Sequence, residues 1–189
     1  GQKSTRRSSE LTRWTPCDTR TMTANPDAPD VYDASFEQQI GVFIDQHRAM
    51  IAASLDGLSE AEARRRLVPS KTTLLGLVKH ATFVERVWFE EARTGRSRAE
   101  LGLQPGPDES FDLTDADTSA SVLDVFARAC ERSRRAVDGV GGDTIWSGNR
   151  RGPLSVRWIL LHVLREHAQH CGHADILREQ VPVSYTHLR

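Results

Sequence analysis

The C-terminal part of the chain contains the segment His162-Val-Leu-Arg-Glu-His-Ala-Gln-His-Cys-Gly-His173. On a helix, positions 162, 166, 170 and 173 lie along one narrow face, because they follow the spacing i, i+4, i+8 and i+11. Ile159, Val163 and Leu177 project around that face. Burying a carboxylate and imidazoles in an apolar stripe costs on the order of several kcal/mol unless a partner compensates them. A divalent metal ion would do so, since it binds neutral imidazole and ionised carboxylate.

Length and composition exclude several classes of protein. The 189 residues are typical of one domain, and the formal net charge of -1 argues against binding to nucleic acid. We find no apolar run long enough to span a bilayer and no signal-peptide pattern, so we expect a cytoplasmic protein that is not bound to a membrane. Three scattered cysteines without a CxxC pair are typical of a reducing compartment.

The two ends of the chain differ from its middle. Residues 1–30 are polar and lack helical or strand periodicity, so we expect a disordered or spurious N-terminal extension. Residues 181–189 are expected to be a non-native tail, because positions 183–188 resemble a translated sequencing-adapter remnant. The predicted domain therefore spans residues 31–180.

Within this domain the hydrophobic pattern predicts helices and no convincing strand. Four long helices are expected at about 34–56, 72–93, 118–138 and 153–180, with a short helical run at 59–66. Such a series predicts an all-α fold, an antiparallel four-helix bundle. The apolar stripe of the first helix consists of Phe36, Ile40, Phe43, Ile44, His47, Met50, Ile51 and Leu55.

Local signals refine these boundaries. Ser35 is a candidate cap for the first helix, and Gly57 is a candidate stop. Gly95 is expected to end the second helix. The last helix is expected to begin at Pro153 or Ser155. The connection at 95–117 is long for a compact domain. Long loops are often functional, for example as lids.

His80 is the candidate third metal ligand. It lies in the apolar stripe of the second long helix, where a lone histidine is more often a core residue with a hydrogen-bond partner. A bundle can, however, present His80 to Glu166 and His170 on a facing helix. Three protein ligands that leave a fourth position open are typical of a catalytic site and not of a closed structural one.

Several motifs resemble those of the DinB-like superfamily, above all its actinobacterial branch of mycothiol-dependent transferases. They are Leu77-Val-Lys-His80, Glu85-Arg-Val-Trp88, Arg157-Trp158-Ile-Leu-Leu-His162 and Glu166-x-x-x-His170-x-Gly-His173-x-Asp175. The resemblance implies a four-helix bundle over about residues 31–180. It also implies a divalent ion, zinc first and nickel second, held by His80, Glu166 and His170. Many relatives have histidine where this chain has Glu166, and the isomerase-type relatives have the same Glu-x-x-x-His pair.

Four further residues are predicted to belong to the site. His162 and His173 flank the ligand face, and we expect them to be catalytic residues that handle protons; alternatively, either could replace Glu166 as a ligand. Arg157 and Trp158 begin the last helix and are expected to contact the cofactor at the mouth of the pocket.

Neighbouring residues have other interpretations. His167 lies about 100° around the helix from Glu166 and is expected to be packed or exposed. Cys171 points away from the ligand face and is interpreted as a small packing residue. Glu85 and Trp88 are expected at the edge of the core near His80. Arg150 and Arg151 either meet an anionic group of a cofactor or substrate or form a solvated turn.

The predicted function is that of a metal-dependent thiol transferase. A coordinated thiol loses its proton, and the metal-bound thiolate can attack an epoxide, an activated alkene, a halide or a quinone. The resemblance implies mycothiol as the thiol co-substrate, a detoxification reaction and a homodimer. Three alternatives stay open: a thiol-dependent isomerase, a metal-dependent hydrolase and a non-catalytic metal-binding bundle.

Overall fold

The computed structural model describes residues 31–181. The tails expected at 1–30 and 181–189 lie outside this range, apart from Val181, whose side chain is buried in the core. No helix within the described range is both long and apolar enough to cross a bilayer.

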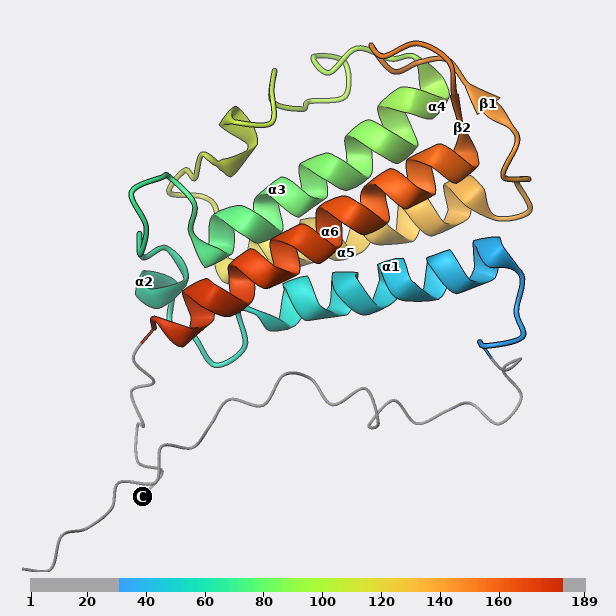
Figure 1. The fold of residues 1–189 in the computed structure, drawn as a ribbon. Coiled ribbons are helices and arrows are strands. Elements are labelled where there is room, and N and C mark those ends of the chain that lie inside the picture. Colours follow the sequence, from blue (N-terminus) through green and yellow to red (C-terminus); the bar gives the residue numbers. More distant parts are fainter. Residues whose placement is uncertain (1–30, 182–189) are drawn as a thin grey trace, which may run out of the picture.

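Four long helices form the bundle, which confirms the all-α prediction (Figure 1). The last helix, α6, packs against α1 and α3, and α3 also packs against α5. The long helices are α1 (Phe36–Ala53), α3 (Leu74–Arg86), α5 (Ser119–Val137) and α6 (Val156–Glu179). The shorter elements are α2 (Glu60–Ala63), the π-helical η2 (Val87–Glu91), α4 (Ala92–Thr94), the 3-10 helix η3 (Glu109–Phe111), β1 (Ile145–Trp146) and β2 (Leu154–Ser155).

The helix ends follow their capping residues. Ser35 closes a capping box with Gln38 at the start of α1, and the Ser155 side chain accepts a hydrogen bond from the backbone of Trp158 at the start of α6. Gly95 ends α4 in the left-handed conformation, with a φ of 70°. These three positions confirm the boundaries expected from the sequence.

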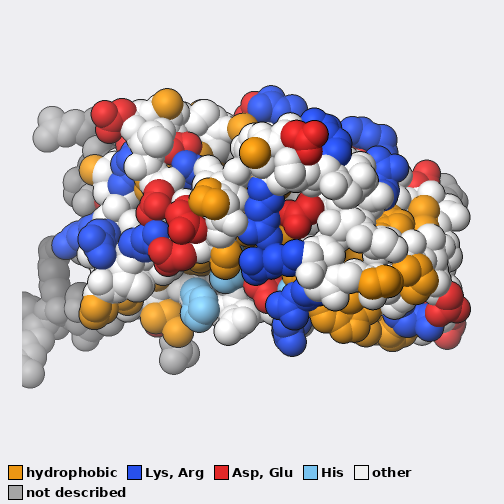
Figure 2. Space-filling model, turned by 90° about the horizontal axis from the view of Figure 1, so that it is seen from above, with side chains coloured by type: hydrophobic (Ala, Val, Ile, Leu, Met, Phe, Trp, Pro, Cys, Tyr) orange, Lys and Arg blue, Asp and Glu red, His pale blue; other side chains and the backbone are white. Residues whose placement is uncertain are grey.

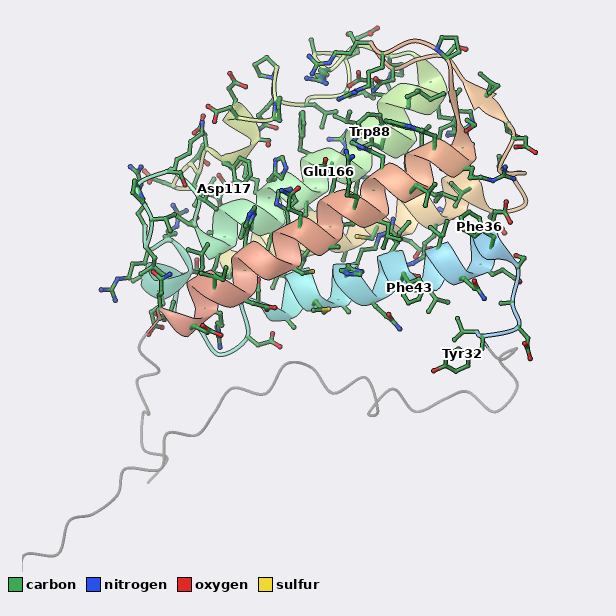
Figure 3. All side chains as sticks on the ribbon, in the orientation of Figure 1. Tyr32, Phe36, Phe43, Trp88, Asp117 and Glu166 are labelled. Carbon is green, nitrogen blue, oxygen red and sulfur yellow. The ribbon has the colours of Figure 1, made fainter. Side chains whose placement is uncertain are left out.

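Two sequence expectations were wrong in detail. Phe36 and Phe43, which were expected in the apolar stripe of α1, are about half exposed. Arg48, which was not expected there, is buried, because its guanidinium has a buried carboxylate partner. Figure 3 shows Phe43 on the outer side of α1. The connection before α6 contains an antiparallel pair of strands, β1 and β2, of only two residues each. A strand of that length is too short to produce a visible alternation.

The core consists of two apolar clusters separated by a layer of polar side chains. One cluster lies toward α2 and includes Ile51, Leu77 and Leu177, and the other lies toward β1 and includes Ile44 and Ile159. On α1, α3 and α6 the residues between the two clusters include buried charged or polar groups.

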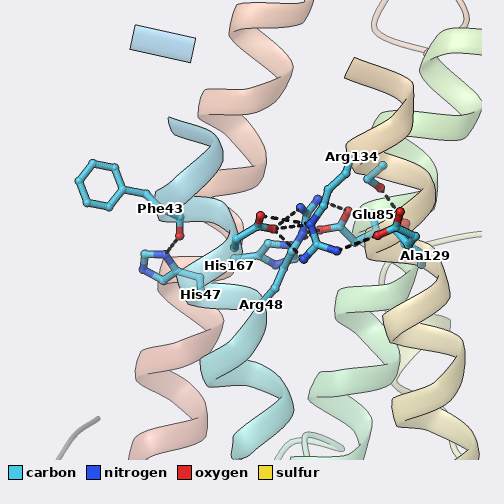
Figure 4. A network of polar contacts seen from close by, with 10 residues as sticks. Phe43, His47, Arg48, Glu85, Ala129, Arg134 and His167 are labelled. Atoms are coloured by element: carbon cyan, nitrogen blue, oxygen red, sulfur yellow. Dashed lines mark hydrogen bonds and ion pairs between the residues drawn. The ribbon is translucent and has the colours of Figure 1, made fainter. Parts of the chain in front are cut away.

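Arg48, Glu85 and His167 form the inner part of this polar layer (Figure 4). The Arg48 guanidinium donates two hydrogen bonds to the Glu85 carboxylate, at 2.8 and 2.6 Å, and His167 Nε2 lies 2.6 Å from the same carboxylate. The side chains of Glu85 and His167 are fully buried. The bidentate Arg48–Glu85 ion pair connects α1 to α3, and the His167–Glu85 contact connects α6 to the same carboxylate.

Candidate metal centre

His80, Glu166 and His170 come together between α3 and α6. One ligand atom from each residue lies within 4.8 Å of the other two, and no other group of this kind occurs among residues 31–181. The two ligands on α6 are one turn apart, so they face α3 together. In Figure 3, Glu166 lies on the side of α6 that faces α3.

His80 is oriented by a residue from the long connection. Its Nδ1 lies 2.6 Å from the Ser110 hydroxyl, and that hydroxyl donates its single proton to the Pro107 carbonyl at 2.6 Å. Ser110 must therefore accept a hydrogen bond from the Nδ1–H of His80, which leaves a lone pair and no proton on Nε2. Burial lowers the pKa of His80 to about 4, so the ring is neutral at physiological pH. A neutral imidazole with a free Nε2 has the donor atom that a metal ion needs.

Phe111 closes the other side of the His80 ring. The two rings are stacked, with centroids 4.1 Å apart and planes 11° apart. The connection at 95–117 thus packs directly on the centre through Ser110 and Phe111. Sequence reasoning found the loop but not these two residues, because neither lies in a motif or in a periodic segment.

His170 is buried without a hydrogen-bond partner. Neither of its ring nitrogens forms a hydrogen bond with a described residue, Nε2 lies 3.7 Å from a Glu166 oxygen, and the ring meets that of His80 edge-on at 4.6 Å. An unpaired buried polar group costs about 1–3 kcal/mol. A bound cation would satisfy one of these nitrogens, which is the clearest structural indication that the three residues fit a metal ion.

Glu166 is the ionised ligand of the group. The interaction with His170 lowers the pKa of Glu166, burial opposes this effect, and the net direction is downward. Its oxygens lie 3.7 Å from Nε2 of His170 and 3.6 Å from Nε2 of His162. Both distances are too long for hydrogen bonds, so a carboxylate oxygen is available to a cation.

A cavity of about 230 Å³ lies beside Glu166. His80, Glu166 and His162 are among its lining residues, together with Trp88 from η2. It is also lined by Phe83, Val84, Val87, Arg98, Pro107, Asn149, Arg150, Arg151 and Arg165. Ligand side chains and a partly apolar wall therefore face the same space.

Of the two predicted catalytic histidines, only His162 faces this cavity. The Arg165 guanidinium donates to its Nδ1 at 2.9 Å, so the proton of the neutral ring is on Nε2, toward Glu166. Burial lowers the pKa of His162 and outweighs the opposing effect of the Glu166 carboxylate. His173 is exposed and lines a separate, largely apolar depression with Ile176.

The two residues expected to contact the cofactor are in different places. The Trp158 ring stacks on His162 at 4.9 Å and tilts against Trp88 at 5.6 Å, so it contacts two residues that line the cavity without lining it itself. Arg157 forms ion pairs with Asp143 and Glu37, at 3.0 and 3.3 Å, and does not line the cavity.

Three neighbouring residues were also assigned from the sequence. His167 and Cys171 are buried and do not belong to the ligand group, as expected. Glu85 is not at the edge of the core: it is fully buried, because the guanidinium of Arg48 balances its charge.

The sequence matches a known protein family. The family model described as mycothiol S-transferase matches residues 39–182. The chain belongs to that family. This mycothiol S-transferase family match covers α1 from residue 39 onward and the whole of α3, α5 and α6, so it includes the three clustered residues.

A solved structure shares the fold. The crystal structure of a conserved protein from Enterococcus faecalis superposes with a TM-score of 0.58 and 14% sequence identity, covering 78% of this chain and 98% of that one. At that identity the likeness concerns the bundle alone. Among curated proteins, no relative matches the chain.

Proposed function

We propose that this protein is a zinc-dependent transferase that joins mycothiol to an electrophile. The observation that supports the proposal most strongly is the buried His170 imidazole, which forms no hydrogen bond and lies beside His80 and Glu166, in a chain of the mycothiol S-transferase family. His80, Glu166 and His170 would hold the ion. When bound, the ion lowers the pKa of a coordinated thiol, which makes the thiolate available at neutral pH.

The protein's own groups prepare the site for this reaction. Ser110 fixes the tautomer of His80, and the neutral His162 directs its Nε2–H toward Glu166. A small movement of either side chain would let His162 donate a hydrogen bond to Glu166 and so position its carboxylate. His162 is less suited to accept a proton, since Arg165 already donates to its Nδ1. Phe111 packs on the His80 ring, and Trp88 forms part of the cavity wall.

The reaction transfers sulfur to carbon. The thiol proton leaves to solvent, a C–S bond forms at the electrophilic carbon, and the leaving group, such as chloride, departs with the electron pair of its bond. We place this reaction in the cytoplasm, where a reduced low-molecular-weight thiol is present. The expected homodimer stays a prediction.

The test is thiol conjugation by the zinc-loaded protein. Wild type should conjugate mycothiol to chlorodinitrobenzene faster than the uncatalysed reaction, and His80→Ala and His170→Ala should lose both bound zinc and turnover. His47→Ala is the matched control, because His47 lies on α1 outside the ligand group. Zinc bound in a 1:1 ratio without thiol-dependent turnover would instead identify a non-catalytic metal-binding bundle and overturn the proposal.

A further inference from the structure

The cavity beside the three clustered residues is bordered by basic side chains. Four arginines line it, and Glu166 is its single carboxylate. Figure 2 looks down on this side of the molecule and shows lysine and arginine side chains in a band across its middle. The four arginines are Arg98, Arg150, Arg151 and Arg165.

Two of these arginines already have partners. Arg98 forms an ion pair with Glu91 at 2.9 Å, and Arg165 donates to His162 and lies 3.8 Å from Glu166. Arg98 therefore has a carboxylate partner, and one donor of Arg165 is taken up by His162.

Arg150 and Arg151 differ, since neither side chain forms an ion pair or hydrogen bond with any residue of the described range. The guanidinium carbon of Arg151 lies 5.8 Å from the centre of the Trp88 ring, at the cavity wall. Two adjacent cations without a carboxylate partner leave an uncompensated positive charge at the mouth of the cavity.

The turn that carries both arginines is fixed to the end of α4. The backbone of Gly148 donates to the Ala92 carbonyl at 2.9 Å, and a Cβ at Gly148 would lie 2.4 Å from backbone atoms of Glu91 and Gly95. Only glycine allows so close an approach.

The same turn is closed from within. The buried Asn149 side chain accepts a hydrogen bond from the backbone of Arg151 at 3.0 Å. The backbone carbonyl of Asn149 accepts another from the backbone of Gly152 at 2.8 Å. The pairing of β1 with β2 joins the two ends of the connection. The backbone of the arginine turn is therefore ordered before any ligand binds, which reduces the entropic cost of binding.

We propose that Arg150 and Arg151 bind an anionic group, most simply a carboxylate, on the electrophile that accepts the thiol. This inference rests on the proposed function and adds the substrate class to it. Mycothiol has no carboxylate of its own, because its cysteine is N-acetylated and joined through an amide to a neutral sugar. The anion must therefore belong to the second substrate. Arginine is suited to it, since its planar fork binds carboxylates in a bidentate manner.

The experiment compares two electrophiles that differ in charge: 4-chloro-3,5-dinitrobenzoate and its methyl ester. Each kcat/KM of the zinc-loaded protein with mycothiol is divided by the uncatalysed rate constant. We expect a carboxylate-to-ester ratio of about ten or more for wild type, and a fall of about tenfold in Arg150→Gln/Arg151→Gln, as for a lost charge-assisted hydrogen bond. The control Arg65→Gln/Arg132→Gln removes two exposed arginines elsewhere and should keep the wild-type ratio.

A binding measurement separates this inference from the proposed function. Quenching of tryptophan fluorescence by unreactive 3,5-dinitrobenzoate, with 3,5-dinitrobenzamide as the neutral probe, needs no turnover. Tighter binding of the anion that is lost in the Arg150/Arg151 variant supports an anion site at these arginines, whether or not the proposed thiol transfer is observed. Equal binding of both probes overturns it. A double variant that raises KM for mycothiol and leaves the charge ratio unchanged would assign the arginines to the thiol and also overturn it.

Discussion

Nδ1 of His80 lies 2.6 Å from the hydroxyl of Ser110, a residue 30 positions further along the chain. The contact connects a candidate ligand on α3 to the connection that covers it, and it fixes which ring nitrogen is free. Such outer contacts orient metal ligands and raise their affinity.

Ser110→Ala should weaken zinc binding by about 10- to 100-fold, because the His80 ring loses its orientation. Competition with a chromogenic chelator measures the affinity. Ser133→Ala is the matched control, since Ser133 is also a buried serine that donates to a backbone carbonyl, in α5 and away from the centre. An unchanged affinity in Ser110→Ala would show that the contact has no effect on the ligand.

Removing the metal should lower stability. If the ion binds only the folded chain, zinc at a hundredfold excess over its Kd raises the free energy of unfolding by about 2.7 kcal/mol, and dipicolinate reverses the increase. Thermal unfolding with and without chelator gives the difference as a shift in Tm. The shift should vanish in His170→Ala; a Tm independent of zinc in wild type would contradict the assignment.

Glu85→Gln should destabilise the bundle by about 3 kcal/mol at pH 7, because it leaves the buried Arg48 without its carboxylate partner. Urea unfolding gives the value. Glu131→Gln removes a carboxylate whose ion pairs are exposed, and it should unfold like wild type. Equal stability of the two variants would mean that the network contributes nothing.

The same network predicts a pH dependence. Burial raises the pKa of Glu85, but His167 and Arg48 outweigh it and lower the pKa from 4.5 to about 2. A depressed carboxyl pKa contributes stability above its unfolded value, and this contribution is lost as pH falls from about 4.5 toward 2. The stability gap between wild type and Glu85→Gln should therefore be largest above pH 5 and shrink in acid. A gap that is constant from pH 7 to pH 3 would contradict the assignment.

Gly148→Ala should cost about 1–3 kcal/mol, since its Cβ would overlap the backbone of Glu91 and Gly95. It should also displace the arginine turn and so lower the carboxylate-to-ester ratio. Gly141→Ala tests the same connection at a position where the nearest atom is an ordinary 3.9 Å away. If Gly148→Ala kept the wild-type carboxylate-to-ester ratio, the contact of Gly148 with α4 would not be required to position the two arginines.

The sequence predicted those parts of the site that depend on helical spacing. Glu166 and His170 are one turn apart on one helix, and His80 occupies a core position on another, so a bundle alone brings them together. Ser110 could not be predicted, because its position depends on how a long connection folds back over α3. Arg48 was missed for another reason: its charge removed it from the apolar stripe, whereas Glu85 on a different helix makes its burial favourable.

The π turn of η2 determines how α4 is rotated relative to α3. The amide of Ala92 bonds to the Val87 carbonyl, five residues back, so the turn holds one residue more than a regular α-helix allows. Deleting that residue would rotate α4, which continues directly from η2, by about 100° relative to α3. The metal ligands, which lie before it or on α6, would keep their places, while the attachment point of Gly148 would turn away. The π turn thus fixes the rotation of α4, which anchors the arginine turn, relative to α3, which carries His80.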